Sequence, residues 1–352
     1  MTEFDRRDFL RTGVGFGTVV IATSLPAMAA TVAHARHFEV VTNVDLAPTG
    51  DADRLWLPLF KSDRAYQKRL ALNWESNAAV RVLQDRASGA EVLFAHWLTG
   101  TEPRHLALTE RIATWDRTSS ARLSSQDRAR WLAPSPALPI DGIVGETARR
   151  ITGGLIEPKA KTRAIYEWVV ANTWRDPATP GCGTGDIAGM LAGGRMGGKC
   201  ADINSLMVGL CRAAGIPARD IYGVRLAPSK RFKSLGRGGG DITTAQHCRA
   251  EVWLEREGWF PVDPADVRKA VLEEKLPVDS APIRDLAETL FGGWENNWAG
   301  YNSASGLALS EAPLSPQFHF LMYPSAMSQS QQPNCLDAAN FCYKITSREI
   351  TV

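Results

Sequence analysis

The sequence lacks a strong excess of charge, a dense set of cysteines, and any long apolar run outside its first thirty residues. Its 352 residues contain 40 Lys plus Arg against 38 Asp plus Glu, which gives a formal net charge of +2. A chain so nearly neutral has no general attraction for polyanions, and this excludes nucleic acid as the main partner. Six cysteines are too few to build a disulfide scaffold.

What is present describes an ordinary folded protein. Hydrophobic residues make up 44% of the chain and charged residues 22%, which excludes disordered, collagen-like and coiled-coil classes. The length predicts two domains, each able to bury its own core. The C-x₂₋₄-C ligand spacing of a zinc site is missing, so we expect neither a metal nor a cofactor.

The first 29 residues have the pattern of an export signal. Arg6 and Arg7 precede a weakly hydrophobic run over 12–25, which is shorter than the roughly 20 residues that a spanning helix needs. An A-x-A site at 27–29 follows, and a second at 33–35 leaves the cleavage position open. The paired arginines indicate the twin-arginine route. We therefore expect a periplasmic or otherwise exported protein with no stable membrane insertion after cleavage.

The pattern of apolar residues changes along the mature chain. Alternation with a period of two over 38–46, 55–59, 92–98 and 106–112 predicts the short strands of an antiparallel sandwich. Beyond a Ser- and Pro-rich connector with a short helix at 126–132, helical spacing begins at 157–172. The predicted fold class is α+β, with this division: signal peptide 1–29, all-β sandwich domain 30–115, connector 116–150, catalytic domain 151–325 and C-terminal tail 326–352.

Cys200 is the candidate nucleophile. It follows two glycines and begins a run to Ala214 with apolar residues at i, i+3, i+4 and i+7, which predicts a buried helix that Gly215 ends. Unpaired N–H groups and the positive end of the helix dipole lower the pKa of a thiol at this position. The same N–H groups could hold an oxyanion that forms beside the sulfur. Taken alone, a cysteine before a helix is more often a small buried residue.

His247 and Asp263 are the candidate partners of this thiol. An alternating run over 246–254 and a second run over 259–263, joined by a turn at 257–258, predict a hairpin. Such a hairpin could set Asp263 beside His247, where a carboxylate would fix the tautomer of the imidazole. The three roles of a Cys-His-Asp site are then filled in chain order.

These blocks resemble the core of the transglutaminase-like superfamily. The resemblance rests on Gly198-Lys199-Cys200-Ala201-Asp202, Gly215-Ile216-Pro217-Ala218-Arg219, His247 and Gly258-Trp259-Phe260-Pro261-Val262-Asp263-Pro264, and it covers roughly 155–270. The flanks resemble those of bacterial exported members. The resemblance implies a papain-like core in which Cys200 is the nucleophile, His247 the general base and acid, and Asp263 the orienting carboxylate. Trp168 or Trp174 could correspond to the tryptophan that shapes the site in cross-linking members.

The remaining cysteines carry separate expectations. Cys248 departs from the family pattern, and on an alternating strand its side chain should point away from the site. Cys335 and Cys342 are the favoured pair for a disulfide in an oxidising compartment. Cys182, on a loop before the helix, could lie near Cys200 and form a reversible disulfide that silences it.

The segment 230–240, rich in Lys, Arg and Gly, has two interpretations: a solvated surface loop, or a mobile lid that favours acidic substrates or a cell-envelope polymer.

The sequence predicts an exported cysteine enzyme that cleaves or transfers amide acyl groups, from peptide bonds or Gln side chains, through a thioester on Cys200. The family contains protein cross-linkers, peptidases and deglycosylating amidases, so the fold does not choose between hydrolysis and transfer. The expected partner is a protein or peptide substrate, or a cell-envelope polymer. The alternative is a catalytically silent envelope binding or scaffold protein that keeps a degenerate fold.

Overall fold

The computed structural model describes residues 35–62, 65–86, 88–116, 123–304, 307, 319–328, 332–337 and 341–351. The predicted signal peptide and its cleavage sites lie outside these residues, except for Ala35. The chain from His34 to Val352 forms one compact unit. No helix within the described ranges is long and apolar enough to cross a bilayer.

Two four-stranded antiparallel sheets, orders β14-β1-β6-β3 and β13-β2-β5-β4, form a strand-rich region. Alternate residues of their strands, such as Val40, Leu57 and Leu106, enter a common hydrophobic core, so the two sheets pack as the predicted sandwich. The alternation predicted four of the strands, but β3 and β4 were missed because their residues are largely exposed on both faces. The strands are β1 (Arg36–Leu46), β2 (Asp53–Pro58), β3 (Gln67–Ser76), β4 (Ala79–Gln84), β5 (Glu91–Trp97), β6 (Arg104–Thr114), β13 (Ser325–Ser328) and β14 (Tyr343–Ile350).

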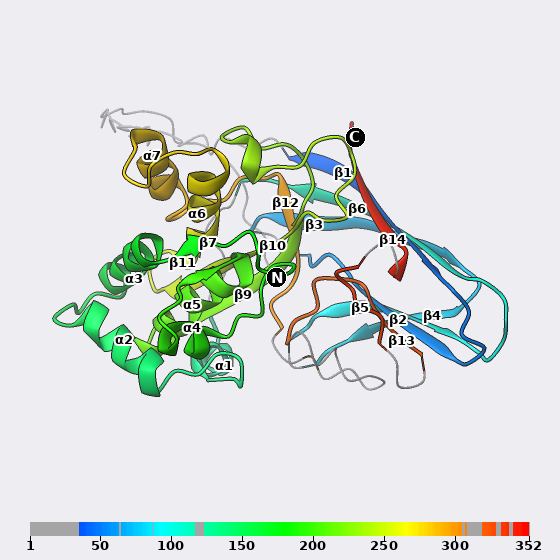
Figure 1. The fold of residues 1–352 in the computed structure, drawn as a ribbon, viewed down its shortest axis with the longest axis horizontal. Coiled ribbons are helices and arrows are strands. Elements are labelled where there is room, and N and C mark those ends of the chain that lie inside the picture. Colours follow the sequence, from blue (N-terminus) through cyan, green and yellow to red (C-terminus); the bar gives the residue numbers. More distant parts are fainter. Residues whose placement is uncertain are drawn as a thin grey trace, which may run out of the picture. The chain divides into compact units, whose positions relative to one another are not determined.

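The segment 326–352 was predicted to be a tail, but within its described residues it contains most of β13 and all of β14, which belong to these sheets. β14 pairs with β1 along eight residues, from His37 opposite Ile350 to Val44 opposite Tyr343, and β13 pairs with β2. β1 is the first strand of the region and β14 the last, so the sheet that contains both is complete only after the whole helical region has been synthesised (Figure 1). The sequence did not predict this pairing, because β14 shows only a short alternation and its partner β1 is distant in the chain.

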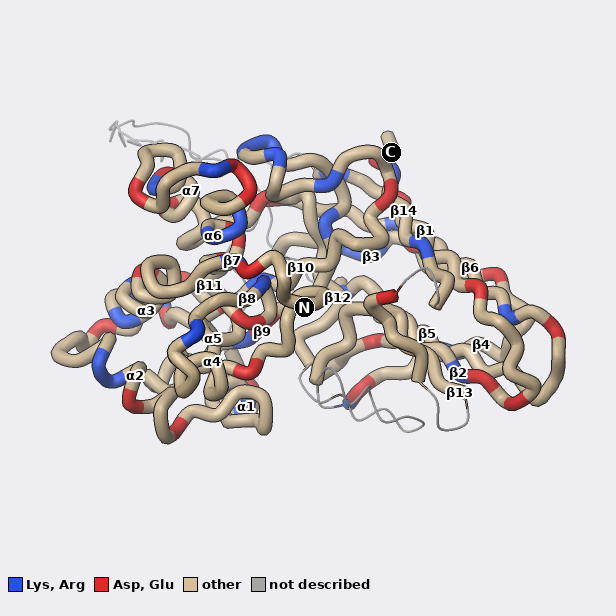
Figure 2. The backbone as a smooth tube through the Cα atoms, in the orientation of Figure 1, with Lys and Arg blue, Asp and Glu red and all other residues tan. Residues whose placement is uncertain are grey.

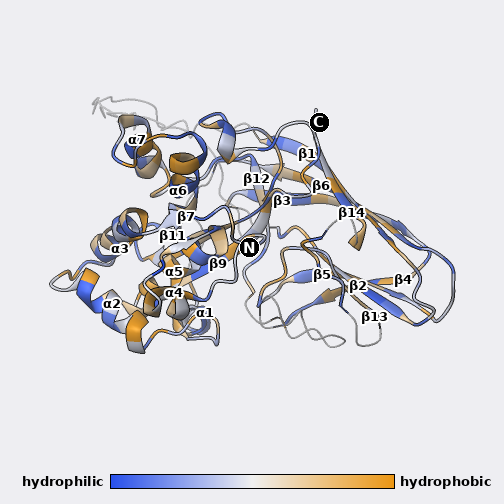
Figure 3. Ribbon diagram, viewed as in Figure 1, coloured by the Kyte–Doolittle hydropathy of each residue, from blue (hydrophilic) through white to orange (hydrophobic). Residues whose placement is uncertain are grey.

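The helical region surrounds a third antiparallel sheet, of order β11-β10-β9-β12. Helix α5 packs on β10 and β9, and α2, α3 and α6 pack on α5. Figure 3 shows α5 as one of the more hydrophobic helices, as a helix covered on most sides must be. The elements are α1 (Ser125–Leu132), α2 (Gly142–Thr152), α3 (Pro158–Asn172), β7 (Trp174–Arg175), α4 (Ile187–Ala192), β8 (Gly197–Gly198), α5 (Cys200–Ala213), β9 (Ala218–Arg225), the short 3₁₀ helix η1 (Lys233–Leu235), β10 (Gln246–Leu254), β11 (Gly258–Val262), α6 (Pro264–Glu273), α7 (Ala281–Thr289) and β12 (Trp298–Asn302).

The helices predicted at 126–132, 157–172 and 201–214 are confirmed within one residue at each end by α1, α3 and α5. Helix α2 was assigned partly to the connector, yet Val144 and Ala148 are fully buried and pack in the helical layer. The predicted hairpin is confirmed as well, because β10 and β11 pair antiparallel from Ala250 opposite Val262 to Leu254 opposite Gly258.

The sandwich is joined to the helical region by buried hydrogen bonds. The Gln67 side chain donates to the Gly300 carbonyl and accepts from the Gly300 N–H, both at 2.7 Å. Thr114 donates to the Asn296 carbonyl at 2.7 Å. Since Gln67 and Thr114 are completely buried, breaking either contact would leave polar atoms without partners, so the two regions are held together firmly.

Candidate active site

Cys200 is the first residue of α5, and 3% of its surface is exposed. The start of the helix is fixed by Asp202, whose Oδ2 accepts the Lys199 N–H at 2.9 Å. The other oxygen of Asp202 accepts the N–H groups of Thr184 and Gly185 at 3.0 and 2.9 Å. One carboxylate therefore caps the helix and binds the loop that precedes it, which holds the thiol in place.

Two glycines allow this close packing. Gly183 has φ of +91°, and a Cβ there would lie 1.9 Å from an Asp202 oxygen. A Cβ on Gly197 would lie 2.4 Å from the Trp174 ring nitrogen. Trp174 lies in β7 beside β8, next to the glycines that precede Cys200, whereas Trp168 is part of α3 and lies beneath Arg150 of α2. Trp174 is therefore the better placed of the two tryptophan candidates.

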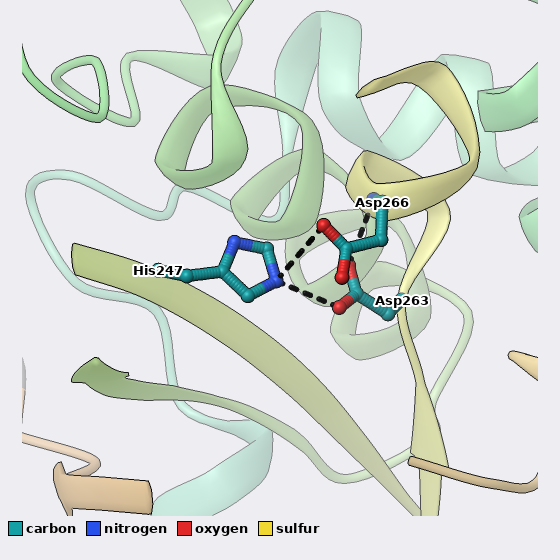
Figure 4. Close-up of side chains that lie close together, drawn as sticks. All are labelled: His247, Asp263 and Asp266. Carbon is teal, nitrogen blue, oxygen red and sulfur yellow. Dashed lines mark hydrogen bonds and ion pairs between the residues drawn. The ribbon is translucent and has the colours of Figure 1, made fainter. Parts of the chain in front are cut away.

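His247, on β10, faces two carboxylates (Figure 4). Its Nε2 lies 2.8 Å from Asp263 Oδ2 and 3.4 Å from Asp266 Oδ1. All three side chains are buried. Because Nε2 is engaged by the carboxylates, Nδ1 is the ring nitrogen left for the thiol. Asp263 was predicted from the hairpin, and the structure brings it to His247; Asp266 was missed.

Besides its contact with His247, Asp263 accepts two further hydrogen bonds that hold it in place. It caps α6, its Oδ1 accepting the Asp266 N–H at 3.1 Å. The same oxygen accepts from Asn204 Nδ2 at 3.1 Å, and Asn204, one turn after Cys200 on α5, also donates to the Cys248 carbonyl at 2.9 Å. Asn204 therefore ties the helix of the thiol to the strand of the histidine and to the aspartate, which fixes their relative positions.

Two buried arginines balance the carboxylates. Arg225 binds Asp266 with two hydrogen bonds of 3.1 and 2.5 Å. Arg249 lies 3.6 Å from Asp263, and its guanidinium sits over the Trp298 ring. His247, Asp263 and Asp266 could in principle hold a metal, since their ligand atoms lie within 4.8 Å of one another. Arg225 already occupies lone pairs of Asp266, and both arginines would repel a cation, so the donor set does not fit a metal ion.

The electrostatics favour a thiolate and an imidazolium. Hydrogen bonds from Cys182 and Cys248 lower the pKa of Cys200 well below its ordinary value; burial opposes this shift, and His247 adds to it. Burial and Arg225 lower the pKa of His247, but Asp266 and Asp263 outweigh them and leave that pKa raised. A lowered thiol pKa beside a raised imidazole pKa favours the ion pair over the neutral pair.

Three thiols meet at the site. Cys182 and Cys248 both hydrogen-bond to Cys200, and burial contributes to raising the pKa of each well above its ordinary value. The expectation that Cys248 points away was wrong: Cys200 approaches the end of β10 closely enough to contact both His247 and its neighbour. Cys182 does lie near Cys200, as predicted, and its carbonyl accepts the Ala201 N–H at 2.9 Å. Both are thiols here, so a disulfide between them stays a prediction.

The hydrogen bond of the Ala201 N–H reduces the number of N–H groups that could hold an oxyanion. Since that N–H donates to Cys182, of the first two N–H groups of α5 only the Cys200 N–H remains as a candidate donor. Tyr323, from the segment before β13, lines the same cavity as Cys182 and Cys200, although it lies far outside the blocks from which the site was predicted.

Cys335 and Cys342, the favoured pair for a disulfide, are both free thiols in this structure. Cys335 is 6% exposed, and burial raises its pKa to about 11, whereas Cys342 is exposed with φ of +55°. The two side chains therefore lie in different environments, despite the short spacing that suggested a bond.

The segment 230–240 is tied to the core. Leu235 is buried and its carbonyl accepts from Arg225 at 2.6 Å, while Ser234 N–H donates to Glu274 at 2.8 Å. Only Gly236 and Arg237 of this segment line the cavity at Cys200. Most of the segment is exposed, as in the solvated surface loop that was one of the two interpretations, and the bonds of Leu235 and Ser234 anchor its middle. A role as a lid stays a prediction.

Comparisons with known proteins agree with this fold. The family model of the transglutaminase-like superfamily matches residues 145–264. An uncharacterised protein of Haemophilus influenzae is 34% identical over 339 residues, covering 89% of this chain and 91% of the relative. A protein-glutamine gamma-glutamyltransferase of Pseudomonas aeruginosa is 28% identical over 59% of this chain, but the match spans only 31% of that protein.

One solved structure shares the architecture over most of the chain. It is that of a Cytophaga hutchinsonii protein provisionally described as a cysteine protease, with a TM-score of 0.56 at 13% identity, covering 91% of this chain and 92% of that one. At such low identity the likeness concerns the fold alone. An α+β core with a strand-rich N-terminal region, a buried cysteine at a helix start and a matching family model define one class. The chain belongs to the transglutaminase-like superfamily, whose members are typically cysteine-based enzymes.

Proposed function

We propose that this chain is a cysteine enzyme that cleaves or transfers amide acyl groups through a thioester. The observation that carries the proposal is the buried contact of His247 with Asp263 at 2.8 Å beside Cys200, whose pKa is lowered. A cavity of about 320 Å³ opens on Cys200 and His247, which gives a substrate access. A scaffold without activity would have no need of a buried thiolate and imidazolium.

In the proposed mechanism, the Cys200 thiolate attacks the amide carbonyl and the His247 imidazolium protonates the leaving amine. Asp263 holds the ring so that Nδ1 faces the sulfur, and it stabilises the positive charge. Water or a primary amine then attacks the thioester, with His247 as the base that takes its proton. Both outcomes use the same residues, so the acceptor decides between hydrolysis and transfer.

The test uses synthetic peptides that contain glutamine, with and without a tagged primary amine. Mass spectrometry would report a cleaved chain, a glutamine converted to glutamate, or an incorporated tag. Cys200→Ala should abolish every product while the circular dichroism spectrum and the unfolding midpoint stay close to wild type. Cys211→Ala, which removes a buried thiol at the other end of α5, is the matched control and should keep activity. Activity that survives Cys200→Ala would refute the assignment.

We further propose that the protein acts outside the cytoplasm on a protein, a peptide or a cell-envelope polymer. The support is the sequence of the first 29 residues, with Arg6 and Arg7 ahead of a short apolar run. Replacing both arginines by lysine should retain the precursor in the cytoplasm, as cell fractionation would show. Unchanged export of that variant would exclude the twin-arginine route.

A further inference from the structure

The cavity above Cys200 is lined by basic side chains. Among its lining residues are Arg175, Lys199, Arg225, Arg237 and Lys269, and no Asp or Glu is among them. The whole chain has a net charge of only +2, so this concentration does not reflect the composition. Figure 2 shows Lys and Arg positions beside α6 and β8, where the elements of the site come together.

Only part of this charge is neutralised by neighbouring carboxylates. Arg225 is paired with Asp266. Arg175 and Lys269 share one partner, Glu273, at 3.0 and 3.8 Å. Two carboxylates thus serve three of the five cations.

Arg237 has neutral hydrogen-bond partners and one nearby carboxylate, that of Asp241, whose pKa its charge helps to lower. Arg237 donates to the Asp241 carbonyl at 3.1 Å and to the Thr244 hydroxyl at 3.3 Å. Within the catalytic group itself, the thiolate of Cys200 offsets the imidazolium of His247, and Asp263 offsets Arg249. Five cations thus face three carboxylates, Asp266, Glu273 and Asp241, so the cavity keeps an excess of about two positive charges in a concave site, where such a field is strongest.

Lys269 is the cation best placed to gain from an anionic ligand. It lies on α6 one turn after Asp266, with 16% of its side chain exposed. Burial and the nearby charge of Arg225 lower the pKa of Lys269 to about 8, although Asp266 and Glu273 favour its charged form. A ligand carboxylate in the cavity would supply the missing negative charge and would stabilise the ammonium.

We propose that the cavity binds a carboxylate of the substrate, so that the protein acts on peptides with an acidic side chain or a free carboxyl terminus close to the attacked amide. This inference rests on the proposed function for its substrate, but the cavity charge can be tested without turnover. Lys269 and Arg237 would hold the carboxylate while Cys200 attacks the neighbouring carbonyl.

The first test compares two alkylating agents of similar size, iodoacetate with a carboxylate and iodoacetamide without one. The ratio of their rate constants at Cys200, divided by the same ratio for the unfolded protein, measures the attraction of the cavity for a carboxylate. We expect a value of about ten or more at low salt that falls as sodium chloride is added. A value near one in the folded protein would overturn the proposal.

Variants assign the effect to the cavity. Lys269→Gln should lower the normalised ratio at least threefold, and Arg237→Gln, on the exposed part of the segment, should lower it too if Lys269→Gln does not fold. Lys68→Gln, at an exposed position of β3, is the matched control and should leave it unchanged. A ratio that is unaffected in both cavity variants would refute the assignment to these residues.

Peptides then separate this inference from the proposed function. Pairs that differ only as Glu against Gln, or as a free against an amidated carboxyl terminus, distinguish the two sources of the carboxylate. A high alkylation ratio with no turnover of any peptide would count against the enzyme and leave the carboxylate site standing. Turnover of amidated, uncharged peptides as fast as of acidic ones would overturn the carboxylate preference and leave the enzyme standing.

Discussion

Replacing Cys182 by alanine should raise the pKa of Cys200 measurably. The hydrogen bond from Cys182 is the largest cause of the lowered pKa of Cys200. The single S–H of Cys182 has a second acceptor, the Gln246 carbonyl at 3.4 Å, but a thiolate attracts a donor more strongly than a neutral carbonyl does. The proton of Cys182 should therefore turn to Cys200 once that thiol ionises, which is the state that the hydrogen bond stabilises.

The size of the effect follows from the energy of such a bond. A hydrogen bond to a charged group contributes about 1.5–3 kcal/mol. At about 1.4 kcal/mol per pKa unit, its loss should raise the pKa of Cys200 by roughly one to two units. His247 and the end of the helix dipole remain in the variant, so the pKa should still lie below that of a free cysteine.

The assay is the pH dependence of the iodoacetamide rate constant at Cys200, followed by mass spectrometry of the labelled peptide. Cys182→Ser keeps a donor at the same place and should shift the curve less than Cys182→Ala. Cys211→Ala removes a buried thiol at the far end of α5 and should not shift it. If the curves of Cys182→Ala and wild type coincide, Cys182 does not lower the pKa of Cys200. A simple rise near pH 8.5 in wild type would instead favour the catalytically silent scaffold.

Two further predictions concern stability. Glu110 is buried, and desolvation raises its pKa to about 8 although the Phe60 N–H donates to it at 3.0 Å. The folded state keeps the proton on Glu110 at pH values at which the unfolded state has already lost it. The stabilisation of the folded state by this protonated side chain is therefore complete below about pH 4 and is lost as the pH rises towards 8. Because glutamine cannot ionise, Glu110→Gln should stabilise the protein at pH 7 by about 3 kcal/mol. Urea unfolding at pH 5 and pH 7 would measure this, and an equal gain at both would contradict it. Asp266→Asn leaves Arg225 buried without its partner and should destabilise the protein by about 3–5 kcal/mol. Asp285→Asn, which breaks an exposed pair with Arg231, should cost less than about 1 kcal/mol in the same experiment, and equal losses would refute the reasoning.

Local patterns were sufficient for the elements that carry the candidate nucleophile and base. The helix that begins at Cys200 and the hairpin that carries His247 and Asp263 have strong periodicity and clear end signals, namely Gly215 with Pro217 and the turn at 257–258. Such signals depend only on neighbouring residues, which explains why the element bounds were predicted closely. The same patterns placed the family resemblance on the matching stretch of the chain.

The residues that surround Cys200, His247 and Asp263 could be identified only from the tertiary structure. Asp266 follows the cap of α6 by three residues, which is a readable signal, and Arg225 and Arg249 are charged residues within buried strands. Their pairing, however, joins elements that are far apart in sequence, and no local pattern states which strand a helix will cover. Cys248 was misplaced for this reason, because alternation gives the face of a strand but not the point at which a helix end approaches it.

The sequence by itself determined the helix of Cys200, the hairpin of His247 and Asp263, and the change from a period of two to helical spacing, because each depends on short-range geometry. Only the tertiary structure decided that β14 closes the sandwich beside β1, that Cys182 and Cys248 bond to Cys200, and that basic side chains from separate elements line one cavity. These features depend on contacts between segments that are distant in the chain. Burial and neighbouring charge, which set the pKa of each group in the site, exist only after those contacts have formed.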